Sequence, residues 1–288
     1  TGEAVIAESL KRWISPPLLP EADATADASA WGVPVALARL LRARGIADAD
    51  AADHFLRPRL SRLDDPLRLP DMPAAVERIA RAIADRERIA VFGDYDVDGI
   101  SATALTLTTL RALEADAVPF LPHRMEDGYG LRAETLRRCI AETGARLIVT
   151  VDCGVNAAEA VADSLAAGVD VVVTDHHLPD AASHPKACAV VNPKRAPDGE
   201  PWRDLSGVGV AFKLCHALLK EGRSRNLAAA HRFDLRARLD LVALGTLADA
   251  VPLSGENRIL ARHGMDLLNR APSPGLRALL NVAAVRGE

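Results

Sequence analysis

The stretch from Ile89 to Gly99 constrains the fold most, because an apolar run there leads into three alternating aspartates, Asp94, Asp96 and Asp98. A short apolar run that ends at a glycine is typical of a buried strand. Alternate side chains of an extended chain share a face, so the three carboxylates would crowd together. Crowded carboxylates need cations, and oxygen ligands suit hard divalent metals. The stretch therefore predicts a metal site at the end of a strand.

The same residues also resemble the start of an EF-hand calcium loop, whose pattern begins Asp-x-Asp-x-Asp-Gly. That loop requires a bidentate glutamate at its twelfth position, where this sequence has Leu105. An EF-hand loop also follows a helix, whereas this run follows a predicted strand. The sequence therefore argues against an EF-hand.

Strand-like apolar runs alternate with helical patterns from residue 71 onward. Continuously apolar strands are typical of a parallel sheet that is covered on both faces. We therefore predict an α/β fold with a parallel five-stranded sheet flanked by helices, in one domain over residues 71–288, whose C-terminal part beyond residue 201 is helical. The predicted strands span residues 89–93, 118–122, 146–152, 169–177 and 187–192, and the predicted helices span 74–86, 100–113, 133–143, 157–167, 208–220, 227–247 and 257–269.

Residues 1–70 contain no strand-like run and are rich in alanine, proline and charged residues. We predict an N-terminal helical extension here, with short helices at 35–44 and 47–56. The acidic segment 21–29 is made of small residues, and we predict a loop there.

Composition excludes several classes of protein. With 49% hydrophobic residues in 288, the chain can bury a sizeable core, and it has no apolar run of eighteen residues that would span a membrane. The net charge of -4 argues against a protein that coats DNA but not against a nucleic-acid enzyme, since bound metals offset acidic ligands. The cysteines show no C-x-x-C spacing and indicate reduced thiols in a cytoplasmic protein. They are Cys139, Cys153, Cys188 and Cys215.

Acidic residues and histidines follow three of the predicted strands. Right-handed crossovers place the C-terminal ends of parallel strands on one edge, so residues 94–98, Asp152 and residues 175–177 should converge there. A carboxylate-rich set with one or two imidazoles favours Mn²⁺ or Mg²⁺ over a thiolate zinc site. Such a site usually holds two ions that clamp a phosphoester. The alternative for residues 175–177 is a helix N-cap followed by surface histidines.

These strand ends resemble the motifs of a known family, the DHH phosphoesterase superfamily. More closely, the chain resembles the RecJ-like exonucleases of that superfamily, which degrade single-stranded DNA from the 5′ end. The matching motifs lie at residues 93–99, 151–154 and 175–177, with further support from 55–66, 123–130, 205–213 and 247–253.

The resemblance implies a set of metal ligands. Asp96 would bind one ion and Asp98 the other, with Asp152 as the bridge between them. His176 and Asp249 would complete the shell of the second ion. From the residues alone, Asp249 is equally well explained as part of a helix end.

The resemblance also implies three residues that act beside the ions. Asp94 would be a ligand or a support for one ion. His177 would face the scissile phosphate as a donor, and Asp175 precedes the two histidines at the same strand end.

The turn at residues 123–130 is a candidate for substrate binding. Arg124 follows a strand end and could grip a phosphate, and Tyr129 between Gly128 and Gly130 could stack on a base. Similarity to RecJ-like proteins places Arg124 at the 5′-terminal phosphate and Tyr129 near the nucleotide. The alternative is an ordinary solvent-exposed turn.

The glycines Gly207 and Gly209 precede a predicted helix. Their backbone N–H groups could bind a phosphate of the substrate. A tight turn for helix packing explains them equally well.

The resemblance implies a metal-dependent 5′→3′ exonuclease that hydrolyses single-stranded DNA to mononucleotides in DNA repair and recombination, by a two-metal-ion mechanism. The implied substrate is single-stranded DNA with a 5′ phosphate, and a single-strand-binding protein or a helicase is a possible partner. The alternative function is a phosphodiesterase of the same superfamily that acts on short oligonucleotides or cyclic dinucleotides. RecJ-like proteins continue into further substrate-binding domains that are not in this sequence, so we expect a catalytic-core portion.

Overall fold

The computed structural model describes residues 20–128 and 130–284. The chain divides into two compact units, one that ends at Pro58 and one that begins at Arg59. This division falls before the limit at residue 70 that we predicted for the N-terminal extension, and the assignment of domains stays a prediction.

The first unit consists of three helices, α1 (Glu21–Trp31), α2 (Val35–Ala43) and α3 (Ala49–Leu56). The loop predicted over residues 21–29 is wrong, because α1 occupies it. Alanine has the highest helix propensity, and α1 buries Ala24, Ala28 and Trp31. Gly32 ends α1 in a left-handed conformation, with φ 65°.

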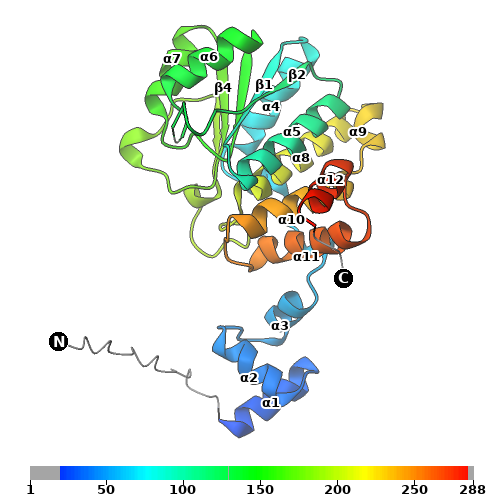
Figure 1. The fold of residues 1–288 in the computed structure, drawn as a ribbon. Helices are drawn as coiled ribbons and strands as arrows, with labels where there is room; N and C mark the ends of the chain where they lie inside the picture. Colours follow the sequence, from blue (N-terminus) through cyan, green and yellow to red (C-terminus); the bar gives the residue numbers. More distant parts are fainter. Residues whose placement is uncertain (1–19, 129, 285–288) are drawn as a thin grey trace, which may run out of the picture. The chain divides into compact units, whose positions relative to one another are not determined.

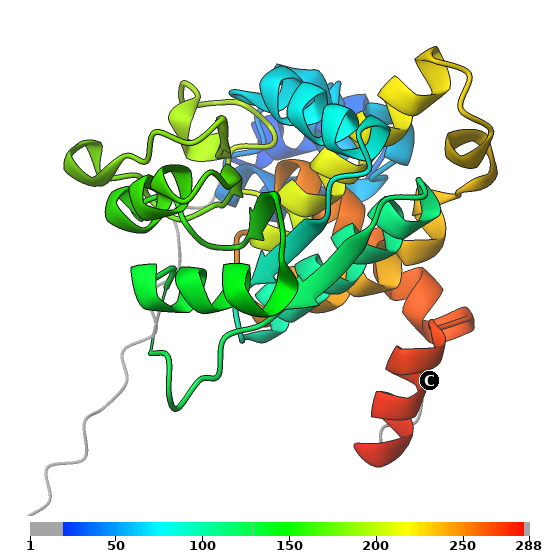
Figure 2. The ribbon, with the colours of Figure 1, turned by 90° about the horizontal axis from the view of Figure 1, so that it is seen from above.

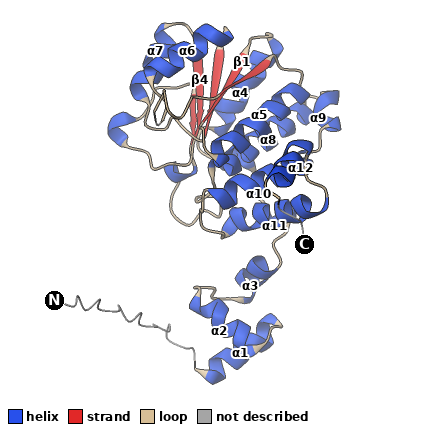
Figure 3. Cartoon of the chain, viewed as in Figure 1, coloured by secondary structure: helices blue, strands red, loops and turns tan. Residues whose placement is uncertain are grey.

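The second unit contains the predicted five-stranded parallel sheet (Figures 1 and 3). Its strands follow the order β2-β1-β3-β4-β5, and every neighbouring pair is parallel. This finding confirms the predicted fold class. The strands are β1 (Ile89–Gly93), β2 (Ala117–Phe120), β3 (Leu147–Val151), β4 (Asp170–Thr174) and β5 (Ala189–Val191).

The two faces of the sheet bury separate hydrophobic clusters, because successive side chains of a strand point to opposite faces. Val91 and Val149 belong to the cluster under α4, α5, α8 and α10, whereas Phe92 and Ile148 belong to the cluster under α6 and α7. The helices α6 and α7 are separated from α8 in both views of the ribbon (Figures 1 and 2). The helices of this unit are α4 (Met72–Ala84), α5 (Val97–Ala112), α6 (Ala133–Thr143), α7 (Ala158–Ala166), α8 (Gly207–Ser224), α9 (Ala228–Arg232), α10 (Leu239–Ala248), α11 (Gly255–Arg270) and α12 (Pro274–Val282).

The single helix predicted over residues 227–247 is wrong, because the structure divides this segment into α9, a 3-10 turn at Leu235–Arg238, and α10. The break follows Phe233, whose backbone is extended. Asp234 then begins a new turn, since its side chain accepts a hydrogen bond from the Arg236 N–H at 3.0 Å. This local bond competes with continuation of the helix.

Two further predictions concern the cysteines and membrane-spanning helices. All four cysteines are free thiols, as predicted. No helix in the described ranges is both long enough and apolar enough to cross a membrane.

The strand order creates a crevice between β1 and β3. From β1 the chain crosses to β2 on one side, and the later strands β3 to β5 are added on the other side. In open α/β sheets, ligands bind at such a reversal, outside the carboxyl ends of the strands. The polar residues that follow β1 and β3 therefore lie where a ligand site is expected.

Candidate metal centre

The aspartates that follow β1 have different environments. Asp94 and Asp98 are buried, whereas Asp96 is exposed. Asp96 is the N-cap of α5, and its carboxylate accepts a hydrogen bond from the Gly99 N–H at 2.8 Å. Asp98 lies in the first turn of α5 and enters the crevice. The three carboxylates therefore differ in their burial and in their surroundings.

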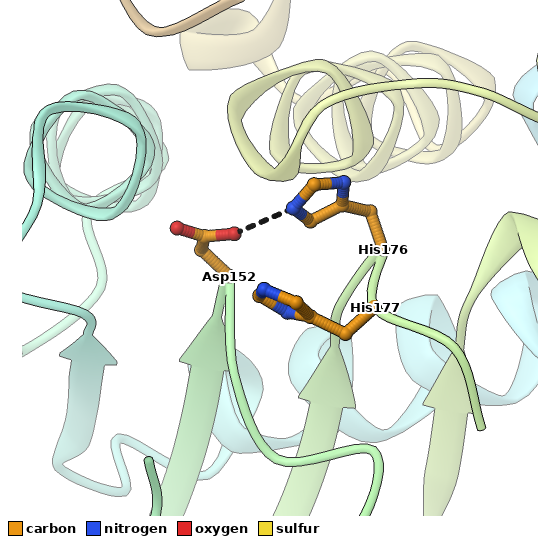
Figure 4. Close-up of side chains that lie close together, drawn as sticks. All are labelled: Asp152, His176 and His177. Carbon is orange, nitrogen blue, oxygen red and sulfur yellow. Dashed lines mark ion pairs between the residues drawn. The ribbon is translucent and has the colours of Figure 1, made fainter. Parts of the chain in front are cut away.

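Five residues from four distant parts of the chain meet at the crevice. Potential ligand atoms of Asp98, His176 and Asp249 lie within 4.8 Å of one another, and those of Asp152, His176 and His177 do the same. His176 belongs to both groups, with its Nε2 3.2 Å from Asp152 Oδ1 (Figure 4) and 3.7 Å from Asp249 Oδ2. The structure thus brings together four of the five predicted metal ligands, and Asp96 belongs to neither group among the described residues.

Several polar atoms of this cluster have no hydrogen-bond partner in the described part of the chain. They are Asp152 Oδ1, Asp249 Oδ2 and both ring nitrogens of His176, and all four atoms are buried. Buried polar atoms in proteins are nearly always paired, so the two carboxylate oxygens that lie beside His176 Nε2 call for a positively charged ligand. Carboxylate oxygens with one imidazole fit a divalent cation such as Mn²⁺.

Asp98 is held by the N-terminus of α8. Its Oδ2 accepts a hydrogen bond from the Gly207 N–H at 2.6 Å, and its Oδ1 accepts one from the Val208 N–H at 2.9 Å. The N-terminus of a helix attracts negative charge, so this contact both fixes and stabilises the carboxylate. Gly209 donates its N–H to Ser206 Oγ at 3.2 Å. The N–H groups of Gly207 and Gly209 thus have acceptors inside the protein, and the substrate contact predicted for them stays a prediction.

Two glycines leave room for the carboxylates. A Cβ atom on Gly207 would lie 2.2 Å from Asp152 Oδ1, and one on Gly245 would lie 2.6 Å from Asp98 Oδ1. Our sequence analysis missed Gly245, which lies inside α10. A glycine in a helix interior costs about 1 kcal/mol relative to alanine and therefore signals a packing or functional reason.

Crowding and burial disturb the ionisation of the cluster. Burial, with the charges of Asp98 and Asp96, raises the pKa of Asp152 to about 10. Burial also raises the pKa of Asp98 to about 6, although the two α8 N–H groups oppose this shift. Burial lowers the pKa of His176. Without a cation, the protein therefore cannot keep all of these groups ionised at neutral pH.

Asp175 supports the histidines and lies outside both ligand groups. It accepts hydrogen bonds from the N–H groups of Val155 at 2.9 Å and His176 at 2.7 Å, and it pairs with His177 Nδ1 at 2.7 Å. Burial would raise the pKa of Asp175, but the bond from His177 and the backbone donors lower it overall. The same bond raises the pKa of His177 to about 9. Asp175 therefore orients His177 and stabilises its charged form.

A pocket of about 340 Å³ opens beside the cluster. Asp94, Asp152, Asp175 and His177 line it on the side of the strand ends. Residues 153–157, Gly130 and Leu131 line the rest. The pocket gives a ligand direct access to the carboxylates and to His177.

The turn at residues 123–130 lies next to β2. The exposed guanidinium of Arg124 stands 5.2 Å above the centre of the Tyr95 ring, in a cation–π contact. Gly128 and Gly130 have φ angles of 72° and 79°, in the left-handed region that favours glycine. Tyr129 lies outside the described residues.

An internal ion pair fixes the first part of this turn. Asp127 accepts a hydrogen bond from the His123 N–H at 2.5 Å and is gripped by both terminal nitrogens of Arg138 at 2.7 and 2.6 Å. Arg124 is therefore presented from an anchored turn.

The profile of the DHH family, N-terminal domain, matches residues 88–246. The chain is 39% identical over 247 residues to the single-stranded-DNA-specific exonuclease RecJ of Bacillus subtilis, and the match covers 86% of this chain and 30% of that protein. Across the similar curated proteins, the chain spans 30–45% of their length.

Solved structures of RecJ proteins are also similar to this chain. A crystal structure of RecJ with Mn²⁺ from Thermus thermophilus superimposes with a TM-score of 0.74 at 32% identity, covering 94% of this chain and 37% of that one. A crystal structure of exonuclease RecJ bound to manganese gives a TM-score of 0.67 at 36% identity, covering 78% of this chain and 55% of that one.

Proposed function

The chain belongs to the DHH family, and on that premise we propose that it is the catalytic portion of a metal-dependent 5′→3′ exonuclease that hydrolyses single-stranded DNA to mononucleotides. The observation that carries this proposal is the convergence of unpaired, buried ligand atoms from Asp152, His176 and Asp249 beside Asp98. The RecJ proteins that resemble it are named as single-stranded-DNA-specific exonucleases. A cytoplasmic role in DNA repair and recombination, with a single-strand-binding protein or a helicase as partner, belongs to the same proposal.

The proposed cofactor is a pair of Mn²⁺ or Mg²⁺ ions. The Mn²⁺ and Mg²⁺ named in similar RecJ structures and the donor set of this cluster both support it. Asp98, His176 and Asp249 would hold one ion, Asp96 the other, and Asp152 would bridge them. Bound there, such ions neutralise the charge of a phosphodiester and lower the pKa of a water molecule.

The remaining residues would position the DNA. His177, oriented by Asp175 and charged at neutral pH, can donate a hydrogen bond to a phosphate oxygen. Arg124 is exposed, and its stacking on Tyr95 leaves the guanidinium edge for a terminal phosphate. Asp94 is buried beside Tyr95 and lines the pocket, where it would support the ions.

The test is digestion of labelled substrates by the purified protein in Mn²⁺. We expect mononucleotides from 5′-phosphorylated single strands, little product from blunt duplex, and no product in EDTA. Asp249→Asn should abolish product release. Asp116→Asn is the matched control, because Asp116 is a half-exposed carboxylate that pairs with Arg88 before β2, away from the cluster.

Two outcomes would contradict the proposal. Full activity in EDTA would rule out the metal-dependent mechanism. Faster hydrolysis of cyclic dinucleotides or of two- to three-nucleotide strands than of long strands would favour the alternative phosphodiesterase.

A further inference from the structure

The N-terminus of α8 connects two candidate ligands that are far apart in the sequence. Its first N–H groups, those of Gly207 and Val208, hold the carboxylate of Asp98. The other ligand, Asp249, is the residue that follows α10. If α8 and α10 shift against each other, the distance between the two carboxylates changes.

One buried hydrogen bond joins these two helices directly at the site. Thr246 in the last turn of α10 places its Oγ1 2.9 Å from the Oγ of Ser206, and both side chains are fully buried. Ser206 is also the N-cap of α8, because its Oγ accepts a hydrogen bond from the Gly209 N–H. Thr246 thus binds the N-cap residue of α8, directly before the N–H groups that hold Asp98.

Asn257 of α11 reinforces the same junction from the other side. Its Oδ1 accepts a hydrogen bond from the Ser206 N–H at 3.4 Å, and its Nδ2 donates to the carbonyl of Pro252 at 3.1 Å. The Pro252 carbonyl lies in the segment that follows Asp249. The start of α8 and both sides of Asp249 are therefore connected by hydrogen bonds that are buried or partly buried.

We propose that Thr246 is a positioning residue that sets the distance between Asp98 and Asp249, and thereby the affinity of the ion that these two carboxylates share with His176. The proposal rests on the proposed function. Thr246 itself lies in neither ligand group. Side chains that orient metal ligands from outside the coordination shell typically contribute 10- to 100-fold to metal affinity. A purely apolar contact would not fix the helices in one register, whereas a buried hydrogen bond has a defined length and direction.

The test is titration of the metal-free protein with Mn²⁺, with calorimetry to obtain both dissociation constants. Thr246→Val removes the hydroxyl and keeps the branched shape, and Ser206 Oγ retains the Gly209 N–H. We expect one of the two Mn²⁺ sites to weaken by roughly 10- to 100-fold while the other changes little. Thr246→Ser restores the hydroxyl and should restore the affinity.

Thr109→Val is the matched control. Thr109 is an equally buried threonine whose hydroxyl bonds to the Leu105 carbonyl within α5 and to Cys215, away from the metal ligands. Its loss should lower the melting temperature without changing either Mn²⁺ constant. Ser206→Ala removes the same bond from the other partner, and the double variant with Thr246→Val should bind Mn²⁺ no more weakly than the weaker single variant.

The results of the Mn²⁺ titrations distinguish a failure of this inference from a failure of the proposed function. If Thr246→Val binds two Mn²⁺ ions as tightly as the wild type, Thr246 has only a structural role and the inference is overturned. Additive losses in the double variant would also overturn it. If the wild type binds no Mn²⁺ in this titration, the proposed function fails as well.

Discussion

Gly207→Ala should inactivate the proposed nuclease without removing any functional group. Gly207 begins α8, and a methyl group there would lie 2.2 Å from Asp152 Oδ1 and 2.5 Å from its Cγ. Non-bonded heavy atoms are comfortable only at about 3.5 Å, so the carboxylate has to move by roughly 1 Å. The N–H group that binds Asp98 stays in place. The variant therefore displaces one proposed bridging ligand selectively.

The size of the effect follows from that displacement. A misplacement of about 1 Å at a reacting group can cost around 10²-fold in rate, which corresponds to about 2.7 kcal/mol of activation free energy. The effect on folding should be smaller. Alanine improves helix propensity by about 1 kcal/mol over glycine, which offsets part of an overpacking cost of about 1–3 kcal/mol.

The assay is the rate of mononucleotide release from 5′-phosphorylated single-stranded DNA in Mn²⁺, together with the melting temperature. Gly209→Ala is the matched control in the same helix, because its methyl group would meet the end of the Leu205 side chain at 2.9 Å and Ser206 Oγ at 3.3 Å, but no candidate ligand. We expect Gly209→Ala to keep most of the activity. A Gly207→Ala protein that cleaves at the rate of the wild type would refute the close approach of α8 to Asp152 as a requirement for catalysis.

Three further predictions concern substrate binding, pH and stability. Arg124→Ala should slow digestion of 5′-phosphorylated strands more than that of 5′-hydroxyl strands, and equal slowing would assign Arg124 to general backbone binding. In EDTA, raising the pH from about 4 to about 6 should lower the melting temperature. Burial raises the pKa of Asp98 to about 6, so between these pH values the folded state binds a proton that the unfolded state has lost, and stability falls as the pH rises. A rising or flat profile would contradict this reasoning, and excess Mn²⁺ should abolish the fall. Lys213→Met should lower the free energy of unfolding by about 3–5 kcal/mol in urea titrations, because it removes the cation 2.8 Å from the buried Glu256, and adding Glu256→Leu should recover much of the loss. A loss below about 1 kcal/mol for Lys213→Met would show that the pair is not desolvated.

Local sequence patterns were sufficient to predict the sheet. Most strands are largely apolar runs such as Leu147–Val151, and an α-helix follows each of β1, β2 and β3, so the parallel arrangement of β1 to β4 follows from the chain order alone. The convergence of acidic residues at the C-terminal edge of the sheet could be predicted for the same reason, because parallel strands end at one edge. The break at Phe233 could not be predicted, because the apolar pattern continues through it and the Asp234 side chain decides the local hydrogen bonding.

The internal support of the site could not be predicted from local patterns. Gly207 and Val208 are more than a hundred residues from Asp98, and an N-terminal helix glycine suits a phosphate or a carboxylate equally well. Only the folded structure shows that the anion bound at this helix N-terminus is the Asp98 carboxylate of the protein itself. Gly245 had a local signal, as a glycine inside a helix, but its partner Asp98 is apparent only in three dimensions.

We propose that the cluster at the strand ends binds two metal ions that Asp152 bridges. The most direct measurement is Mn²⁺ stoichiometry and nuclease rate for the wild type and Asp152→Asn, with the melting temperature of each metal-free protein. We predict two ions and activity for the wild type, and loss of hydrolysis for Asp152→Asn. The metal-free variant should be at least as stable as the wild type, because burial and the neighbouring carboxylates raise the pKa of Asp152 to about 10. An Asp152→Asn protein that binds two ions and cleaves at nearly the wild-type rate would show that Asp152 does not bridge the ions.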